Sequence, residues 1–342
     1  MPDKQLQAKD IKDGQAINDL FLVKEMNRGE TKAGKPYLSL SLMDASGEIG
    51  ARVWDNADQL MGQCPVGAIV AVTGQAQAYK GIIQLKIDAI QRVAENEVDP
   101  ALFVPSTSGD IKLMSKELLK IISGVENPFL KELLLAIFGK KSLMRDFAKA
   151  PAAKAMHHAY VGGLLEHTLA VARLAEQVSA LYPGMDRSLL ISGALLHDIG
   201  KLKEFDFSSY PADYSDSGRL MGHMVLGIEM IQEKIDEVAG FPKELAVQLK
   251  HLILSHHGRH EFGSPTLPMM TEAFVLNFLD DLDAKVNYMG RLAKQIDGEN
   301  YQWTDYQRNL ERFLFIKGHK SDELNQTNDQ ETDIDPRQHR LF

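Results

Sequence analysis

Histidines and aspartates recur through the second half of the chain in short polar segments that follow or interrupt apolar stretches. The adjacent pair His197-Asp198 follows the apolar run 189–196, which must be buried. A histidine and an aspartate at the end of a buried helix are costly unless a partner offsets their desolvation. Imidazole and carboxylate are the usual ligands of Mn, Fe, Co, Zn and Mg-like ions. The pair therefore indicates a divalent-metal site.

Further segments of the same chemistry lie before and after this pair. Asp280 ends the apolar stretch 274–279, and His167 lies among leucines. One histidine on an apolar helix face is more often a hydrogen-bonded core residue than a ligand. Because the set recurs in one chain, we favour a metal site over several separate core histidines. Asp281 and Asp283 remain alternatives to Asp280. The candidate ligands are His167, His197, Asp198, His223, His256, His257 and Asp280.

These residues need helices to position them. Apolar residues at helical spacing, with Ser115 as a helix cap, predict an all-α domain over 113–317. No strand pattern persists beyond residue 112. The expected helices cover roughly 128–138, 163–182, 187–197, 220–238, 243–255 and 270–296.

The first hundred residues have a different pattern, which is typical of β-strands, and apolar and polar residues alternate along 37–43. Five strands with a short helix (56–61) between the third and fourth are the order of an OB-fold barrel. We therefore expect a multi-domain chain, with an N-terminal all-β OB-fold barrel over 10–95 and a linker over 96–112. The polar, acidic segment 318–342 is expected to be a disordered tail. The expected strands are 17–23, 37–43, 48–54, 68–73 and 81–87.

Composition narrows the class of protein. The length of 342 residues suits two or three domains. The net charge of −9 argues against a protein that coats nucleic acid by bulk charge. The single cysteine, Cys64, excludes an internal disulfide framework. No apolar run is long enough for a membrane span, and no apolar region follows the first residues. We expect a cytoplasmic protein without membrane partners.

The order of the motifs, H…HD…D with extra histidines between, resembles the HD superfamily of metal-dependent phosphohydrolases. The similarity is sharper to the bacterial 3′→5′ exoribonucleases of the YhaM type, which join an N-terminal OB-fold to an HD domain. It covers about residues 10–317 and implies that 113–317 is the HD domain. The runs that carry it are 157–168, 196–201, 222–227, 254–258 and 279–285.

The resemblance implies roles for the candidate residues. His167, His197, Asp198 and Asp280 would hold a first divalent ion. Asp198 would bridge to a second ion held by His223 and His256, with His257 nearby. Manganese is the expected metal, with cobalt, iron, magnesium, zinc and nickel as alternatives, and one or two ions are open. The expected catalytic residues are Asp198, together with Lys201 and His158 as phosphate contacts.

The barrel has candidate residues for nucleic-acid binding. OB-folds bind single strands through aromatic stacking and a basic groove. The expected loop between the first two strands holds Lys24, Arg28, Lys32 and Lys35, and Trp54 could equally belong to the barrel core. From residue 10 to 95 there are nine bases and eleven acids, so the charge signal is modest. The candidate stacking residues are Tyr37, Trp54 and Tyr79.

Three functions remain in view. The first is a metal-dependent 3′→5′ exoribonuclease that releases nucleoside 5′-monophosphates from single-stranded RNA, with single-stranded DNA as a second substrate. The second is a nucleotide or cyclic-dinucleotide phosphohydrolase. Its cyclic form is weakened because Gly-Ser-Pro at 263–265 stands where Gly-Tyr-Pro would follow the paired histidines. The third is a single-strand-binding protein with a vestigial HD site, which the complete ligand set disfavours. A homo-oligomer formed through the apolar stretch 128–138 is left open.

Overall fold

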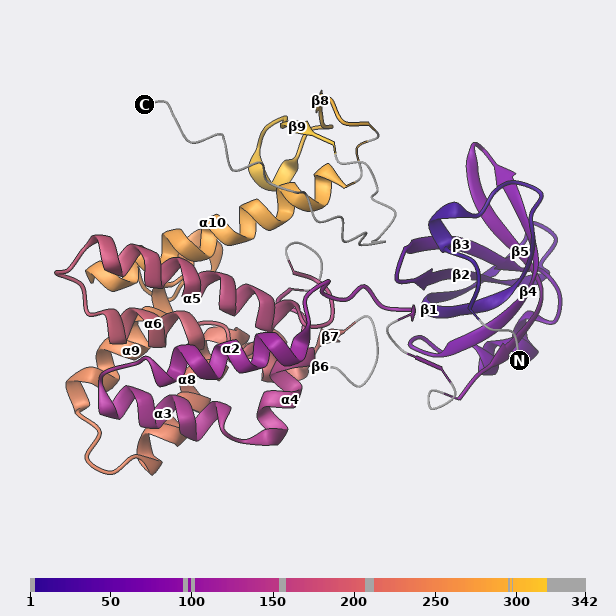
Figure 1. Cartoon of the computed structure of the whole chain (residues 1–342). Helices are drawn as coiled ribbons and strands as arrows, with labels where there is room; N and C mark the ends of the chain where they lie inside the picture. The colour runs from indigo at the N-terminus through magenta and orange to yellow at the C-terminus, as the bar shows by residue number, and fades with distance from the viewer. Residues whose placement is uncertain are drawn as a thin grey trace, which may run out of the picture. The chain divides into compact units, whose positions relative to one another are not determined.

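The computed structural model describes residues 4–94, 98–99, 102–153, 158–206, 212–294, 296 and 298–318 (Figure 1). A first compact unit ends at Lys285, and a second begins at Val286. The described site residues introduced above all precede Val286. Most of the expected acidic tail, from residue 319 onward, and part of the expected linker lie outside the described residues.

The N-terminal part is a closed five-stranded barrel in the order β1-β2-β3-β5-β4 (Figure 1). Only β3 and β5 are parallel neighbours. Along β2, Leu38, Leu40 and Leu42 are buried and alternate with partly exposed residues, as expected for a strand with one face in the core. The predicted OB-fold barrel is thereby confirmed. Its elements are β1 (Ala16–Glu30), β2 (Pro36–Asp44), β3 (Gly47–Val53), α1 (Ala57–Leu60), β4 (Ile69–Tyr79) and β5 (Ile82–Arg92).

The first strand is longer than predicted. β1 continues along β2 until Glu30 pairs with Pro36. Lys24 and Arg28 therefore lie on a strand, and assigning them to a loop was wrong. Lys32 and Lys35 do lie in the turn that joins β1 to β2. The alternation of β1 changes near Val23, where the pairing shifts, so the sequence pattern stopped short of the strand's end.

The second part is mostly helical, as predicted. Asp110, not Ser115, caps the first of these helices, because its side chain accepts hydrogen bonds from the backbone of Lys112 and Leu113. The helix that precedes His197 is buried at every position except Arg187. The helices are α2 (Ile111–Ser123), α3 (Pro128–Phe138), α4 (Lys141–Lys149), α5 (Gly163–Leu181), α6 (Arg187–Leu196), α7 (Lys201–Glu204), α8 (Asp216–Glu237), α9 (Lys243–Ser255) and α10 (Thr271–Ala293).

Two short ribbons contradict the expectation that no strand follows residue 112. β6 (Phe205–Asp206) pairs with β7 (Asp213–Tyr214), and β8 (Tyr301–Trp303) pairs with β9 (Phe315–Lys317). Strands of two or three residues are too short for an alternating pattern to be recognised. They leave the fold class unchanged, because helices form the core of this part.

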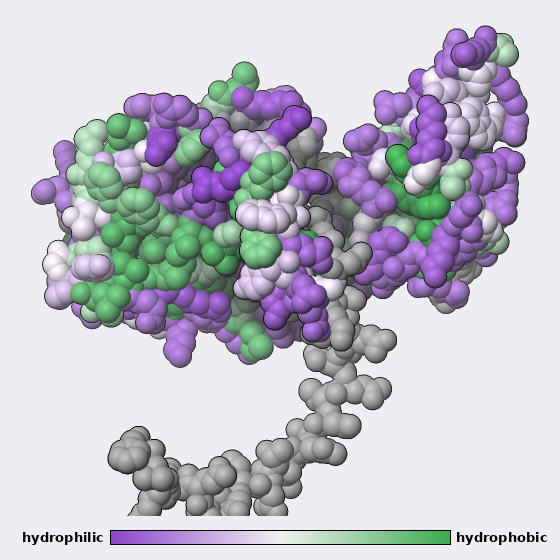
Figure 2. All heavy atoms as spheres, turned by 90° about the horizontal axis from the view of Figure 1, so that it is seen from above, coloured by the Kyte–Doolittle hydropathy of each residue, from purple (hydrophilic) through white to green (hydrophobic). Residues whose placement is uncertain are grey.

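Two apolar surfaces of the helical part, on α3 and on α10, are relevant to the homo-oligomer that the sequence left open. The apolar side of α3, including Leu130, Leu133 and Ile137, is buried in the helical core, so its composition is explained without an interface. On the molecular face shown in Figure 2, hydrophobic side chains gather over the helical part. Exposed Phe274 and Phe278 lie on α10, the helix that carries Asp280. Among the described residues, no helix combines the length and apolar character needed to cross a bilayer.

Candidate metal centre

Four side chains from three segments converge on one point. His167 lies in the second turn of α5, His197 and Asp198 follow α6, and Asp280 lies on α10. The Nε2 atom of His167 is 3.1 Å from both His197 Nε2 and Asp280 Oδ1. Asp198 Oδ2 lies 3.4 Å from His197 Nε2 and 3.6 Å from His167 Nε2. Ligand atoms about 2.1 Å from one ion lie about 3 to 3.5 Å from each other. The spacing therefore suits a single divalent ion.

The second oxygen of Asp198 faces a different group of histidines. Asp198 Oδ1 is 3.5 Å from His223 Nε2 and 3.7 Å from His256 Nε2. His257 joins them, since one ring nitrogen from each of the three histidines falls within 4.8 Å of the others. One carboxylate thus offers an oxygen to each of two ligand sets, which is the arrangement of a bridging ligand between two ions.

The hydrogen bonds of the histidines fix which nitrogen is available. His197, His256 and His257 each place Nδ1 at 2.7 to 2.9 Å from a backbone carbonyl oxygen. A carbonyl oxygen carries no proton, so Nδ1 must donate and a neutral ring keeps its lone pair on Nε2. His167 and His223 direct Nδ1 to the carboxylates of Asp283 and Glu204. In all five rings Nε2 is therefore the atom left for a metal.

Three buried atoms of the centre have no hydrogen-bond partner among the described residues. They are Asp198 Oδ1, His223 Nε2 and His256 Nε2. Each is an acceptor, and they face one another, so none can satisfy its neighbours. Unsatisfied buried polar atoms are costly. A divalent cation among them would satisfy all three, so the residues present fit the metal that this donor set implies.

The electrostatics of the centre also suit a cation. Burial opposes the charge of Asp198, but Lys201 and His197 hold its pKa well below the ordinary range. Burial likewise disfavours a charged His167, yet its hydrogen bonds to Asp280 and Asp283 raise the pKa of His167 to about 9. Without a metal, His167 thus supplies the positive charge between these carboxylates. Burial, reinforced by the neighbouring His257, lowers the pKa of His256 well below its usual value, which keeps this ring neutral.

The structure distinguishes the three aspartates of α10. Only Asp280 approaches both His167 Nε2 and His197 Nε2, at 3.1 and 3.8 Å. Asp281 is exposed and pairs with Lys285 at 2.5 Å. Asp283 Oδ2 accepts from His167 Nδ1 at 2.7 Å and lies 2.9 Å from His158 Nε2. The geometry therefore favours Asp280 as the ligand and gives Asp283 the role of orienting His167.

The two predicted phosphate contacts lie inside the centre. The Nζ of Lys201 is buried and donates to Asp198 Oδ2 at 2.6 Å. His158 is also buried, with Nε2 on Asp283 and Nδ1 2.9 Å from the Tyr160 hydroxyl. Both side chains thus bond to the carboxylates or their neighbours in this structure, and their contact with phosphate stays a prediction.

Glu204 is part of the centre and was missed from the sequence. Its Oε1 atom lies 3.0 Å from the backbone nitrogen of His223 and 3.1 Å from His223 Nδ1. It follows Lys201 and Lys203, so in sequence it belongs to a charged stretch typical of a solvated surface. Nothing in that pattern reveals that Glu204 is buried beneath a histidine.

The barrel surface carries an aromatic pair. The rings of Tyr37 and Trp54 lie 5.0 Å apart, and Trp54 is 38% exposed, so it belongs to the surface and not to the barrel core. Tyr37 lies across Gly29 of β1, where a Cβ atom would come within 2.6 Å of the tyrosine ring. Tyr79 is exposed at the end of β4. The pair is therefore accessible for stacking.

The basic residues of the barrel are largely paired with acids. Arg28 Nε donates to Asp58 at 2.7 Å, and Lys35 Nζ donates to Asp55 at 2.6 Å. Lys24 forms an ion pair with Glu48. Three of the four basic residues predicted to contact nucleic acid therefore already have carboxylate partners, which the sequence count of acids and bases could not show.

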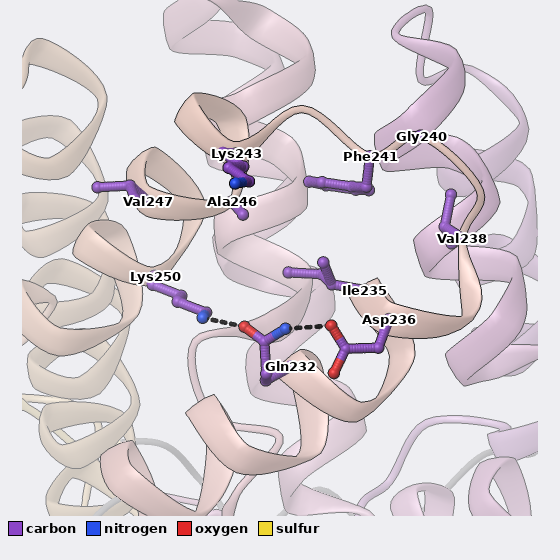
Figure 3. Close-up of a pocket in the computed structure, with 10 residues that line it drawn as sticks. All are labelled: Gln232, Ile235, Asp236, Val238, Gly240, Phe241, Lys243, Ala246, Val247 and Lys250. Atoms are coloured by element: carbon purple, nitrogen blue, oxygen red, sulfur yellow. Dashed lines mark hydrogen bonds between the residues drawn. The ribbon is translucent and has the colours of Figure 1, made fainter.

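A cavity of about 490 Å³ lies elsewhere, between the end of α8 and the start of α9 (Figure 3). Among its lining residues, Lys250 donates to Gln232, which donates to Asp236. None of its lining residues is a histidine, and none belongs to the candidate ligand set. The cavity is thus separate from the metal centre.

Comparison with known families assigns both parts of the chain. Residues 164–285 match the HD domain, and residues 22–93 match the OB-fold nucleic acid binding domain. The HD match begins at the start of α5 and contains every candidate ligand. The chain therefore carries an HD domain, which indicates a metal-dependent phosphohydrolase, together with an OB-fold. Divalent-metal binding is a property of HD domains, and the histidine and aspartate clusters are compatible with it.

Solved structures similar to this chain match it over about a quarter of its length. A replication protein A heterotrimer bound to ssDNA is 18% identical, with 25% of this chain and 61% of that chain covered and a TM-score of 0.20. A domain of replication protein A from Methanococcus maripaludis is 18% identical, covering 26% and 93%, with a TM-score of 0.23. The priB protein from Ralstonia solanacearum is 16% identical, covering 23% and 97%, with a TM-score of 0.21. At these values the similarity says nothing about what the barrel binds.

Proposed function

We propose that the protein is a metal-dependent 3′→5′ exoribonuclease that removes nucleoside 5′-monophosphates from single-stranded RNA. The observation that carries the proposal is Asp198, which offers one oxygen to each of two ligand sets. Divalent ions in such a pair of sites lower the pKa of water and stabilise both the attacking and leaving oxygens of an in-line phosphoryl displacement. A phosphodiester is therefore the substrate bond that fits this centre.

Most residues of the centre would bind the ions, and Lys201 would contact the phosphate. The first ion would be held by His167, His197 and Asp280, and the second by His223 and His256. Asp198 would be shared by both sets, and His257 lies beside the second set. Lys201 neutralises Asp198 through its ion pair. With ions bound at both ligand sets, the Lys201 ammonium would be available to a non-bridging phosphate oxygen, where its positive charge would stabilise the transition state. We expect manganese as the working metal.

The OB-fold supports a polymeric substrate. A hydrolase of free nucleotides has no evident use for a barrel with an aromatic pair at its surface, whereas an exonuclease must hold the strand whose end it cleaves. Stacking on Tyr37 and Trp54 tolerates any base, which suits an enzyme that degrades without regard to sequence. Single-stranded DNA would stack in the same way, so we extend the proposal to DNA as a second substrate.

The test is a 5′-labelled single strand of RNA of about 20 nucleotides, longer than the site of one OB-fold. It is incubated with Mn²⁺ and either the wild-type protein or Asp198→Ala, and the products are resolved on a gel. We expect a ladder that shortens from the 3′ end with the wild-type protein only. RNA that stays intact with wild-type protein, while free nucleotides are hydrolysed, would overturn the exonuclease and favour a nucleotide phosphohydrolase.

The paired cations of the barrel give a second prediction. Asp58→Asn removes the charge of one of the two carboxylates that pair with Arg28 and leaves only the pair with Glu30, which makes the guanidinium more available to a backbone phosphate. We expect RNA to bind a few-fold more tightly and with a steeper dependence on salt concentration, measured by fluorescence anisotropy with Ca²⁺ in place of Mn²⁺. Asp13→Asn, which alters an acid on the segment before β1, is the matched control. Equal affinity for all three proteins would show that Arg28 does not contact RNA.

A further inference from the structure

His223 is held from two sides by one carboxylate oxygen. Glu204 Oε1 lies 3.0 Å from its backbone nitrogen and 3.1 Å from its Nδ1. Both Glu204 and His223 are largely enclosed, with side chains 10% and 12% exposed. The other two histidines of this set, His256 and His257, direct Nδ1 to neutral carbonyl oxygens. Glu204 is therefore the charged orienting group of this set.

The backbone bends to make this contact. Gly222, inside α8, has φ 73° and ψ 161°, which breaks the regular helix directly before His223. In an unbroken helix the amide of His223 would donate to a carbonyl four residues earlier. The break turns this amide toward Glu204 instead. Only glycine adopts such backbone angles at little cost. The helix is thus irregular at the point where the His223 backbone is hydrogen-bonded to Glu204.

Two further glycines lock α7 against α8. A Cβ atom on Gly200 would lie 1.9 Å from the carbonyl oxygen of His223, and one on Gly218 would lie 2.0 Å from the carbonyl oxygen of Glu204. The two backbones therefore meet directly, with no side chain between them. Ser215 adds a backbone hydrogen bond of 2.9 Å to Glu204. The distance between Glu204 and His223 is thus set by backbone contacts and does not depend on a metal.

The two ligand sets follow the same plan. In the first set, Asp283 accepts from His167 Nδ1 at 2.7 Å, and in the second, Glu204 accepts from His223 Nδ1 at 3.1 Å. A carboxylate behind a histidine fixes the ring orientation and makes Nε2 a stronger ligand. Each set thus contains one histidine strengthened in this way. His223 Nε2 points at Asp198 Oδ1 and has no hydrogen-bond partner among the described residues.

We propose that Glu204 is the positioning residue that sets the affinity of the second divalent ion, acting through His223. The proposal rests on the two-set metal centre of the proposed function. Loss of such an outer partner costs about 10- to 100-fold in metal affinity. Glu204→Gln keeps the size and one acceptor oxygen but loses the charge, so it should weaken the second ion by that factor and leave the first ion unchanged.

The experiment measures metal binding by the full chain without RNA. Wild type, Glu204→Gln, His223→Ala and Glu229→Gln are titrated with Mn²⁺ by calorimetry, and the bound metal is examined by electron paramagnetic resonance. Glu229 is an exposed acid on α8, the helix that carries His223, so Glu229→Gln is the matched control. We expect two ions and the signal of a coupled manganese pair in wild type and Glu229→Gln. Glu204→Gln at limiting Mn²⁺ should give the isolated-ion signal of His223→Ala and regain the coupled signal at higher Mn²⁺.

Three results would overturn the proposal. They are a single ion in the wild type, an unchanged second ion in Glu204→Gln, and the loss of both ions in that variant. In the third case Glu204 would support the whole fold, and thermal unfolding would show it. Because no RNA is present, the result is independent of the substrate. Loss of the second ion in a protein that leaves RNA intact would keep this proposal and refute only the exonuclease.

Discussion

Asp280→Asn is expected to lower the rate of RNA cleavage by roughly 10³-fold or more, because it removes a ligand at the point where charge must be stabilised. Asp280 Oδ1 is 3.1 Å from His167 Nε2 and completes the first ligand set. The amide keeps the shape of the side chain but carries no charge. The first ion should therefore bind far more weakly, and added Mn²⁺ should restore only part of the activity.

Asp281→Asn is the control that the chain itself offers. Asp281 is adjacent to Asp280, has the same chemistry and pairs with Lys285 on the exposed side of α10. Its loss should leave both cleavage and Mn²⁺ stoichiometry unchanged. Cleavage rates and metal titrations of the two variants, measured side by side, decide the assignment. If Asp281→Asn proves the inactive one, the ligand set read from the geometry is wrong.

The sequence could indicate the candidate centre where a residue type and a burial pattern coincide. His197 and Asp198 follow an apolar run that can only be a buried helix. The desolvation cost of burying these two side chains therefore required a partner such as a metal ion. The structure brings the whole predicted ligand set together. The choice among Asp280, Asp281 and Asp283 needed the helix in three dimensions, because all three lie within one turn of α10.

The sequence could not reveal the residues that act through others. Glu204 and Asp283 touch the ligands only because segments far apart in the chain meet, and no local pattern records that meeting. The barrel shows the same limit. Its class followed from five predicted strands with a short helix between the third and fourth, but the extension of β1 to Glu30 depends on pairing with β2. The ion pairs of Lys24, Arg28 and Lys35 with Glu48, Asp58 and Asp55 join different segments of the chain and were also hidden.

Lys4→Met is expected to destabilise the barrel by about 3–5 kcal/mol, the cost of removing one partner from a buried ion pair. The Lys4 side chain is 7% exposed and lies 2.7 Å from Asp44 and 3.7 Å from Asp19, both of which are buried. Its ammonium also sits 4.1 Å from the centre of the Phe21 ring. Without it, two carboxylates remain inside the barrel with no cation.

The measurement is urea unfolding of the full chain followed by Trp54 fluorescence, with Trp303→Phe as background so that only the barrel reports. Lys9→Met, which alters an exposed lysine of the same segment, should have no effect. Adding Asp44→Asn to Lys4→Met should recover part of the loss, because it removes one of the stranded charges. A loss below about 1 kcal/mol, the range of an exposed pair, would contradict the buried role of Lys4.

The loss of stability caused by Lys4→Met should become smaller as the pH falls. Burial raises the pKa of Asp44, but Lys4, the Ser46 hydroxyl and the Ala8 amide outweigh it and hold the pKa below its usual value. A carboxyl with a lowered folded-state pKa stabilises the fold above its unfolded pKa of about 3.9 and loses that contribution as pH falls through the folded value.

In Lys4→Met the pKa of Asp44 rises, so the carboxyl accepts a proton at higher pH and no longer buries an unpaired charge. The stability difference between wild type and variant should therefore be full at pH 7 and should narrow as the pH falls through the raised folded-state pKa of Asp44 in the variant toward the lowered folded-state pKa in wild type. A constant difference from pH 7 to pH 3 would show that Lys4 acts through packing on Phe21 and not through its charge.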